Sequence, residues 1–457
     1  MPPDTIAAIA TPLGEGALAV IRLSGPAACV VADRTFVPGG ASSKTVSAAP
    51  THTIHYGHII AGGRVVDEVL VAVLRAPRTF TREDCVEITC HGGVFAAKAV
   101  LDAVLVAGAR LAEPGEFTRR AFLNGRIDLA QAEAVADLIA ARTELALSAA
   151  NEQLAGRLSR RINEVRDQMM LTLAHIEAHI DFPDEDIAPD THAQLVDRLR
   201  QARQFMDDLL RTAREGQILR RGIRAAIIGR PNAGKSSLLN QLLGHERAIV
   251  SAIPGTTRDT IEETANVRGL PVVFIDTAGL REGADEIEIE GIRRSRTSLE
   301  RAELVLHVLD CSEPLTEADR VYLHEFAGKK RILVRNKSDL PHRLELPALP
   351  PAVPVVDLSC TTGDGIEVLK DAIKALVWSG EVGADMAQVT INSRHEDALR
   401  RAREATDNTI RTFVDSDALE LAAMELRIAV NAIGEVVGRT TTEDLLDAIF
   451  SQFCLGK

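Results

Sequence analysis

The spacing of apolar residues divides the chain into segments with different secondary structure. In residues 1–118, short apolar runs such as ALAVIRL and EVLVAVL alternate with Gly and Pro turns, and one helical stretch, FAAKAVLDAVLVAG, follows HGG. From Leu129 onward, apolar residues recur at the helical period until DFPDED, at Asp181–Asp186, interrupts them, and a second helical stretch ends near Gly216. These patterns predict an α+β domain over 1–118 and the first part of an all-α domain over 119–217.

Strand and helix patterns alternate in the middle of the chain. Residues 218–380 contain the buried-strand runs RAAIIG, PVVFI, ELVLHVLD, RILVR and PVVDL, with the helical run SSLLNQLL after the first. Such alternation is typical of a doubly wound α/β domain. Beyond residue 384, three helical stretches are each apolar on one face, which they cannot bury alone. We therefore expect 381–457 to form the second part of the helical domain, with the α/β domain inserted between the two parts.

Composition and charge restrict the class of protein. The 457 residues exceed the size of a single core, and 46% hydrophobic with 26% charged residues is typical of globular proteins. The formal net charge of -13 opposes a general attraction to polyanions. The cysteines form no C-x-x-C pair, and the sequence shows neither a basic leader nor a run of ~18 apolar residues. These features predict a cytoplasmic protein without a membrane span.

A phosphate-binding loop lies near the start of the inserted domain. The segment GRPNAGKS, Gly229–Ser236, matches G-x-x-x-x-G-K-[ST] and lies between the strand RAAIIG and the helix SSLLNQLL, as its mechanism requires. Its backbone amides and the helix N-terminus favour phosphate. We expect Lys235 to reach the β- and γ-phosphates and the Ser236 hydroxyl to ligate magnesium.

Two further segments carry groups for the γ-phosphate and for magnesium. GTTRD, Gly255–Asp259, offers a threonine that can close over both, which is the task of a first switch. DTAG, Asp276–Gly279, ends the strand PVVFI, so Asp276 can hold magnesium through water while the Gly279 amide senses the γ-phosphate. Each of these patterns is weak evidence alone. The evidence is stronger because the patterns occur in the expected order along the chain.

The segment NKSD, Asn336–Asp339, determines which base is bound. Guanine presents two adjacent donors that the Asp339 carboxylate can accept together, whereas adenine presents an acceptor there, and an unpaired carboxylate costs roughly 1–3 kcal/mol or more. SCTT, Ser359–Thr362, can place a loop amide against the guanine oxygen, although Cys360 replaces the commoner alanine. The five elements together predict a GTPase. The predicted nucleotide contacts are Asn232, Ala233, Gly234, Lys235, Ser236, Ser237, Thr256, Thr257, Asp276, Thr277, Ala278, Gly279, Asn336, Lys337, Asp339, Ser359, Cys360 and Thr361.

The residue after DTAG departs from the Ras-like pattern. It is Leu280, where that pattern has a glutamine that orients the attacking water. Because leucine cannot orient water, another group must do so. The following segment, 281–290, is rich in carboxylates, although most of them are expected to be solvated surface charges.

From end to end, the chain resembles the MnmE (TrmE) family of tRNA-modification GTPases. The resemblance is carried by IATPLGEGALAVIRLSG, EFTRRAFLNGRIDLAQAEAVADLI, DFPDED, GRPNAGKSSLLN, PGTTRD, DTAGLRE and the C-terminal FCLGK. It implies a homodimer whose N-terminal domain binds 5-formyltetrahydrofolate or a related folate, and an FAD-dependent partner of the MnmG type in a hetero-oligomer. Together they would install an aminomethyl or carboxymethylaminomethyl group at carbon 5 of the wobble uridine of certain tRNAs.

The resemblance also implies roles for individual residues. Folate contacts would fall on four charged residues, Arg22, Glu87, Arg126 and Lys457. At position 126 the family commonly has lysine, so the charge is kept while the geometry differs. Catalytic roles would fall on Glu288 in GTP hydrolysis and on Cys454 near the chain end. Magnesium would be ligated by Ser236 and Thr257, and potassium by Asn232, Ser251, Ile253 and Thr256, with Ser251 also beside the nucleotide.

Two other functions stay open from the residues alone. A ribosome-assembly or regulatory GTPase would share the five elements, but a ribosome-assembly GTPase needs an RNA-binding module. After residue 380, acidic residues outnumber basic ones and no G-x-x-G loop of a KH-type module occurs. The second alternative is a folate-dependent one-carbon enzyme regulated by its G domain. The FCLGK end and the helical segments favour tRNA modification over both.

Overall fold

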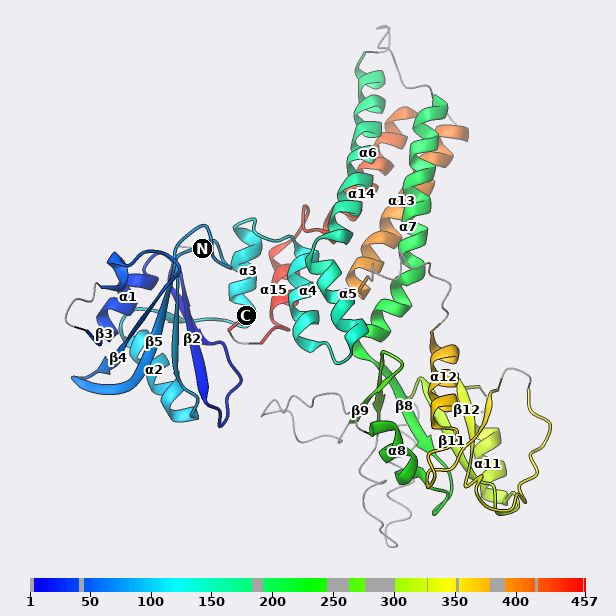
Figure 1. Ribbon diagram of the computed structural model, residues 1–457. Helices are drawn as coiled ribbons and strands as arrows, with labels where there is room; N and C mark the ends of the chain where they lie inside the picture. Colours follow the sequence, from blue (N-terminus) through cyan, green and yellow to red (C-terminus); the bar gives the residue numbers. More distant parts are fainter. Residues whose placement is uncertain are drawn as a thin grey trace. The chain divides into compact units, whose positions relative to one another are not determined.

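The protein forms two compact units in a computed structural model. The residues described are 4–40, 45–182, 192–244, 263–275, 301–326, 328–350, 353–378, 391–415, 418–454 and 456–457. The first unit consists of Met1–Ala136 together with Asn431–Lys457, and the second consists of Asp137–Val430. Figure 1 shows the elements of each.

The first unit contains a seven-stranded sheet with the strand order β3-β4-β5-β6-β2-β1-β7. Its strands are β1 (Ile6–Ile9), β2 (Leu18–Ser24), β3 (Phe36–Pro38), β4 (Thr53–Ala61), β5 (Arg64–Leu74), β6 (Cys85–His91) and β7 (Arg110–Leu111). Neighbouring strands are antiparallel, except that β1 and β7 are parallel. Buried residues alternate along the strands, as Ala19, Ile21 and Leu23 do on β2, because successive side chains point to opposite faces.

Helices of the first unit follow the predicted α+β pattern. They are α1 (Ala28–Thr35), α2 (Val94–Val106), α3 (Glu116–Leu123), α4, which begins in this unit (Leu129–Ala140), and α15 (Glu443–Phe450), with a short 3-10 helix at Val46–Ala48. Both α1 and α2 contact the sheet, and their apolar residues share one core with its strands. The prediction of an α+β fold at the N-terminal end is confirmed.

The end of the chain returns to the N-terminal sheet. Helix α15 contacts α3, and the Phe117 amide donates a hydrogen bond of 3.2 Å to the Lys457 carbonyl. Gly456 has a φ of +88°, and a Cβ atom there would lie 2.5 Å from the Ile9 carbonyl oxygen. Only glycine fits this close approach. The last residues are therefore held against β1 by their own backbone.

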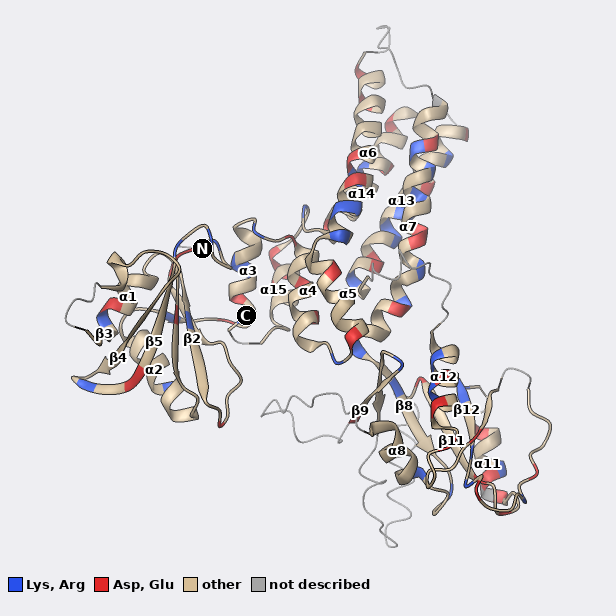
Figure 2. Ribbon diagram, in the orientation of Figure 1, with Lys and Arg blue, Asp and Glu red and all other residues tan. Residues whose placement is uncertain are grey.

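One part of the second unit consists of helices. They are α5 (Glu144–Leu154), α6 (Arg157–Asp181), α7 (His192–Arg221), α13 (Ser393–Asp415) and α14 (Leu419–Val436), whose residues from Asn431 onward belong to the first unit. Helix α7 packs against α6 and α13. Charges of both signs follow these helices (Figure 2), and Arg203 of α7 forms a 3.3 Å ion pair with Asp407 of α13. The helices on either side of the α/β insertion therefore pack together, as expected.

Helix α7 differs from the prediction at its end. Helix α6 ends at Asp181, where DFPDED begins, but α7 continues through Gly216 to Arg221. It continues because Ile218 and Leu219 extend its apolar face into a core shared with the α/β sheet, which outweighs the ~1 kcal/mol cost of a helical glycine. Gly222, with a φ of +75°, ends it. The expected end near Gly216 is wrong.

The inserted segment forms the predicted α/β fold. Its six-stranded sheet has the order β13-β12-β11-β8-β10-β9, with parallel neighbours except for the antiparallel pair β9 and β10. The strands are β8 (Ile223–Ile228), β9 (Glu263–Val267), β10 (Leu270–Phe274), β11 (Leu304–Asp310), β12 (Arg331–Asn336) and β13 (Val355–Asp357). The helices are α8 (Lys235–Leu243), α11 (Glu317–Glu325) and α12 (Ile366–Val377).

Strand order in this sheet locates the place for a ligand. Strand β8 pairs with β10 on one side and with β11 on the other. Ligands of such sheets bind at the carboxyl ends of the strands where the order reverses, which here is the loop after β8.

Within the described ranges, none of the helices is long and apolar enough to cross a membrane.

Candidate functional site

The loop after β8 has the backbone shape of a phosphate cradle. It joins β8 to α8, and both Asn232, with a φ of +62°, and Gly234, with a φ of +98°, adopt left-handed conformations. Successive residues of changing hand turn backbone N–H groups toward a common point, and the N-terminus of α8 adds favourable dipole charge for an anion. The predicted loop between strand and helix is present.

Lys235 lies over this loop. Its ammonium group donates a hydrogen bond of 2.8 Å to the Arg230 carbonyl, and burial lowers the pKa of Lys235 below its ordinary value. Ser236 follows on the exposed first turn of α8, where its hydroxyl is a hard oxygen ligand of the type that magnesium prefers. These two residues therefore fit the roles expected for phosphate and magnesium contacts.

Asn336 links three of the predicted nucleotide elements. The residue is 2% exposed, its Nδ2 atom donates to the Ala233 carbonyl at 2.8 Å, and its Oδ1 atom accepts from the Cys360 amide at 3.1 Å. The phosphate loop, NKSD and SCTT are thus joined through one buried amide. A Cβ atom at Gly234 would lie 2.0 Å from Asn336 Nδ2, so glycine is required there. Asn336 is a positioning residue that fixes the three loops relative to one another.

Lys337 is fixed by a carboxylate that the sequence reasoning missed. Asp310, 4% exposed at the end of β11, accepts from Lys337 Nζ at 2.6 Å and from the Ser312 hydroxyl at 2.6 Å. Burial opposes ionisation of Asp310, but the hydrogen bonds from Lys337 and Ser312 outweigh it and hold the pKa of this carboxyl below its ordinary value. A signal was present, because an aspartate at the carboxyl end of a strand beside NKSD lies at the ligand-binding edge of the sheet.

The residues predicted to contact the base are Asp339 of NKSD and those of SCTT. Asp339 is exposed in a turn closed by the Leu340 amide and the Lys337 carbonyl at 3.0 Å. Its carboxylate forms no hydrogen bond or ion pair with another residue in the described part of the chain. In SCTT, Ser359 Oγ accepts from the Thr361 amide at 3.3 Å and so fixes the shape of the loop. The Asp339 carboxylate is therefore available to a base that lies between these loops.

Cys360 takes part in this arrangement through its backbone. Its amide contacts Asn336, and its carbonyl accepts a 2.8 Å hydrogen bond from Gln241 Nε2 of α8. Burial raises the pKa of the Cys360 thiol to about 11. The thiol therefore stays protonated at neutral pH. Cys360 stands where alanine is commoner, and the backbone contacts of the loop are kept. Gln241 is a second contributor that no sequence motif marks.

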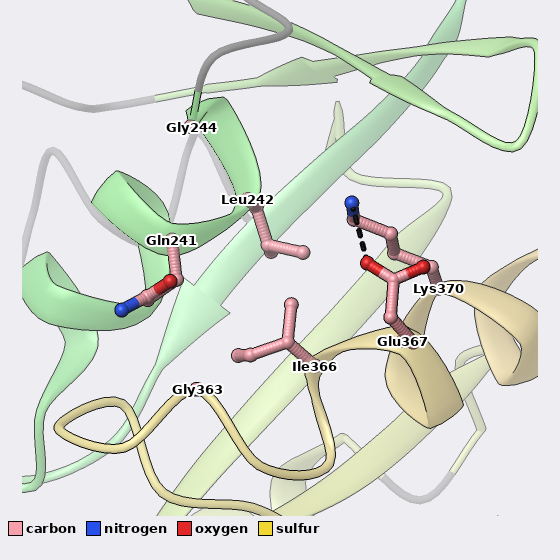
Figure 3. A pocket seen from close by; sticks show the side chains of 7 residues that line it. All are labelled: Gln241, Leu242, Gly244, Gly363, Ile366, Glu367 and Lys370. Atoms are coloured by element: carbon pink, nitrogen blue, oxygen red, sulfur yellow. Dashed lines mark ion pairs between the residues drawn. The ribbon is translucent and has the colours of Figure 1, made fainter.

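A cavity of about 290 Å³ opens between α8 and the beginning of α12. Figure 3 shows Leu242 and Ile366 facing one another across it. Glu367 and Lys370 on its rim form an ion pair of 2.9 Å and so satisfy each other's charge. The cavity is lined by Gln241, Leu242, Gly244, Gly363, Ile366, Glu367 and Lys370. Gln241, which lines the cavity, supports the SCTT loop through its hydrogen bond to the Cys360 carbonyl.

Some predicted site residues lie outside the described residues. They are Ser251, Ile253, Thr256, Thr257, Asp276, Thr277, Ala278, Gly279 and Glu288.

A second group of predicted residues meets in the first unit. Arg22 on β2 forms a 2.8 Å ion pair with Glu87 on β6, and its guanidinium lies 5.8 Å from the centre of the Phe117 ring. Burial lowers the pKa of Lys457, and the neighbouring Arg22 lowers it further, while Glu87 and Cys454 act in the opposite direction. Residues from both ends of the chain thus form one electrostatic cluster.

Arg126 and Cys454, the other predicted residues of the first unit, have contacts of their own. Arg126 lies with its guanidinium 5.4 Å from the centre of the Phe80 ring and donates to the Thr79 carbonyl. Cys454 is an exposed free cysteine whose carbonyl accepts from the Gly115 amide at 3.4 Å. Arg22 and Lys457 each bring a cationic side chain to the cluster, beside the Glu87 carboxylate.

Two family models match consecutive parts of the chain. Residues 129–454 match the family model described as MnmE helical domain, and residues 5–126 match the model described as GTP-binding protein TrmE N-terminus. The tRNA modification GTPase MnmE of Geobacillus kaustophilus is 50% identical over 460 residues, covering 99% of each chain. That of Bacillus subtilis is 46% identical, covering 99% of this chain and 100% of its own. Among solved structures, the G domain of the T. maritima FeoB iron transporter is 27% identical over 34% of this chain and 98% of that chain, with a TM-score of 0.25.

Proposed function

Because this chain belongs to the MnmE family of tRNA modification GTPases, we propose that its GTP hydrolysis serves modification of the wobble uridine of tRNA at carbon 5. Family membership makes the chain a GTP hydrolase that takes part in tRNA modification. The finer proposal is that it delivers a folate one-carbon unit and acts with an FAD-dependent partner of the MnmG type. The group installed would be aminomethyl or carboxymethylaminomethyl.

The nucleotide half of the proposal follows from the loops around β8. Lys235 would contact the β- and γ-phosphates, and the loop amides would surround them. Ser236 and Thr257 would hold magnesium, which neutralises charge that develops on the phosphates. Asp339 would accept both donors of guanine. The Asn336 and Asp310 contacts support this, because they fix the loops before any nucleotide arrives.

Hydrolysis requires groups other than a Ras-like glutamine, since Leu280 occupies that position. We assign the water-positioning role to Glu288 on the family resemblance. Potassium would be held by oxygen ligands of Asn232, Ser251, Ile253 and Thr256 and would supply positive charge beside the phosphates. Of these, Asn232 is supported by its left-handed conformation in the exposed phosphate loop.

The folate half of the proposal rests on the cluster that joins the two ends of the chain. Arg22 and Lys457 offer two positive charges beside Glu87, and Phe117 adds an aromatic face. This donor set fits a ligand with carboxylate groups and a flat ring system, as folates have. Arg126 would contribute a further cation. Cys454 lies at the same end of the chain and would act in, or beside, transfer to the uridine.

The proposed assembly is a cytoplasmic homodimer that binds tRNA and forms a hetero-oligomer with the FAD-dependent partner. We further propose the domain limits expected from the sequence: a folate-binding and dimerisation domain over 1–118, a helical domain over 119–217 and 381–457, and the GTPase domain over 218–380. The match of one family model to 129–454 supports a helical domain that continues after the insertion.

The single observation that carries the proposal is the meeting of Arg22 and Lys457 at Phe117: Arg22 lies over its ring and pairs with Glu87, and the Lys457 carbonyl accepts from its amide. Equilibrium dialysis with 5-formyltetrahydrofolate tests it. Arg22→Gln should weaken binding by at least ~10-fold, because hydrogen bonds to charged groups contribute roughly 1.5–3 kcal/mol. The matched control is Arg64→Gln, which changes an exposed arginine on β5. Equal folate affinity in the two variants would contradict the assigned folate site. The assignment of GTP hydrolysis would stand, because it does not depend on Arg22.

A further inference from the structure

Three metal-ligating side chains meet beside the guanine-contact loops. They are Cys311, the residue after β11, His342 in the segment after β12, and Asp357, the last residue of β13. The ligand atoms of all three lie within 4.8 Å of one another. Cys311 is buried, and the other two are exposed. None of the three belongs to the predicted nucleotide, magnesium or potassium contacts.

Backbone hydrogen bonds hold this group together. The Cys311 carbonyl accepts from the Arg343 amide at 2.7 Å and from the Leu344 amide at 3.2 Å. These bonds fasten the segment that carries His342 beside Cys311, and Leu344 is itself 4% exposed and anchors it. The Cys311 amide donates to the Asn336 carbonyl at 2.9 Å. The positions of the ligands are therefore set by the fold and do not depend on flexible side chains alone.

The donor set selects the class of metal. A thiolate, an imidazole and a carboxylate are together the ligands of zinc, whereas magnesium and potassium prefer oxygen alone. Zinc bonds of about 2.0–2.3 Å in a tetrahedron place ligand atoms roughly 3.3–3.8 Å apart. The observed limit of 4.8 Å exceeds this by about an ångström. Rotation of the exposed His342 and Asp357 side chains closes such a gap, and their solvent side leaves room for water as a fourth ligand.

Two interactions compete with a metal ion at this place. Arg335 pairs with Asp357 at 2.5 Å, so one carboxylate oxygen must be shared or released. Burial raises the pKa of Cys311 to about 11, and the nearby Asp357 contributes. A metal ion must therefore displace the thiol proton, as is general for thiolate ligands.

We propose that Cys311, His342 and Asp357 bind one zinc-class divalent cation, with water as the fourth ligand. The ion would join the carboxyl ends of β11 and β13 to the segment after β12. Asp310, which fixes Lys337 of NKSD, immediately precedes Cys311. Occupancy would therefore steady Asp310 and, through it, Lys337 of NKSD.

Cobalt(II) alone is the probe that tests the site, because thiolate–cobalt charge transfer reports a sulfur ligand directly. All proteins would be full-length and carry Cys454→Ser, which removes the exposed thiol. The parent should bind one cobalt with a charge-transfer band, and zinc should abolish the band. Cobalt at the predicted magnesium site has only oxygen ligands and gives no such band.

Two ligand variants and one control complete the experiment. Cys311→Ser should remove the band. His342→Gln should lower cobalt affinity by at least ~10-fold, which is the smaller end of the losses in affinity seen when the surroundings of a metal are changed. His324→Gln, an exposed histidine on α11, is the control and should match the parent. No band in the parent, an undiminished band in Cys311→Ser, or equal affinity in His342→Gln and His324→Gln overturns the proposal. If Cys311→Ser fails to fold, the exposed His342 variant decides.

Discussion

Replacement of Asn336 by alanine should loosen the nucleotide site before any nucleotide binds. The variant leaves the buried Ala233 carbonyl without its donor and the half-buried Cys360 amide without its acceptor. An unsatisfied buried group costs about 1–3 kcal/mol and a lost partly solvated hydrogen bond about 0.5–1.5 kcal/mol. We therefore expect the free energy of unfolding of this domain to fall by about 2–4 kcal/mol.

The assay uses the single tryptophan of the chain, Trp378, which follows α12 and packs against the core of the α/β sheet. Urea titration of its fluorescence in nucleotide-free, full-length protein reports unfolding of this domain without stabilisation by bound ligand. Affinity for GDP should fall by at least ~10-fold, equivalent to about 1.4 kcal/mol. Asn240→Ala, at an exposed position on α8, is the matched control and should change stability by no more than ~0.5 kcal/mol. Equal unfolding midpoints and GDP affinities in the two variants would refute the reasoning.

Other parts of the site lead to further predictions. Asp339→Asn should transfer preference from GTP to XTP, because an amide can donate to the xanthine 2-oxo group; competitive binding of the two nucleotides checks this, and retained tight GTP binding contradicts it. Glu288→Ala should lower kcat for GTP by at least ~10²-fold with little change in nucleotide affinity; normal turnover would reject the assigned role. GTP hydrolysis in matched potassium and sodium chloride should be faster in potassium, and equal rates would remove Asn232 from the proposed cation shell. Cys454→Ser should abolish tRNA modification while GTP turnover stays near normal, and a joint loss of both would indicate a structural role for Cys454.

Local patterns were sufficient to predict the phosphate loop and the α/β fold. The P-loop motif lies directly between a strand and a helix, so its place at the carboxyl end of β8 follows from the neighbouring residues alone. The same reasoning placed NKSD after the strand RILVR, and its first residue, Asn336, is the last residue of β12. Gly216 shows the limit, because a glycine that reads as a helix end lies inside α7 when apolar residues beyond it are buried by another part of the fold.

Contacts between distant segments could not be predicted from spacing. The Asn336 amide joins Ala233 to Cys360, and nothing in their separation along the chain shows which backbone groups it meets. Resemblance to a family, and not periodicity, grouped Arg22 with Lys457, and the structure brings them together through the return of the chain end to β1. Asp310 was within reach of sequence reasoning, since it ends a strand beside NKSD, but its partner Lys337 was assigned to the nucleotide alone.

The most direct test of the central claim is mass spectrometry of tRNA nucleosides from a strain that lacks this gene. We predict loss of the uridines that carry an aminomethyl or carboxymethylaminomethyl group at carbon 5 of the wobble position. They should return when the wild-type chain is supplied, and should stay absent when the chain carries Cys454→Ser. Unchanged 5-substituted wobble uridines in the deletion strain would contradict the account.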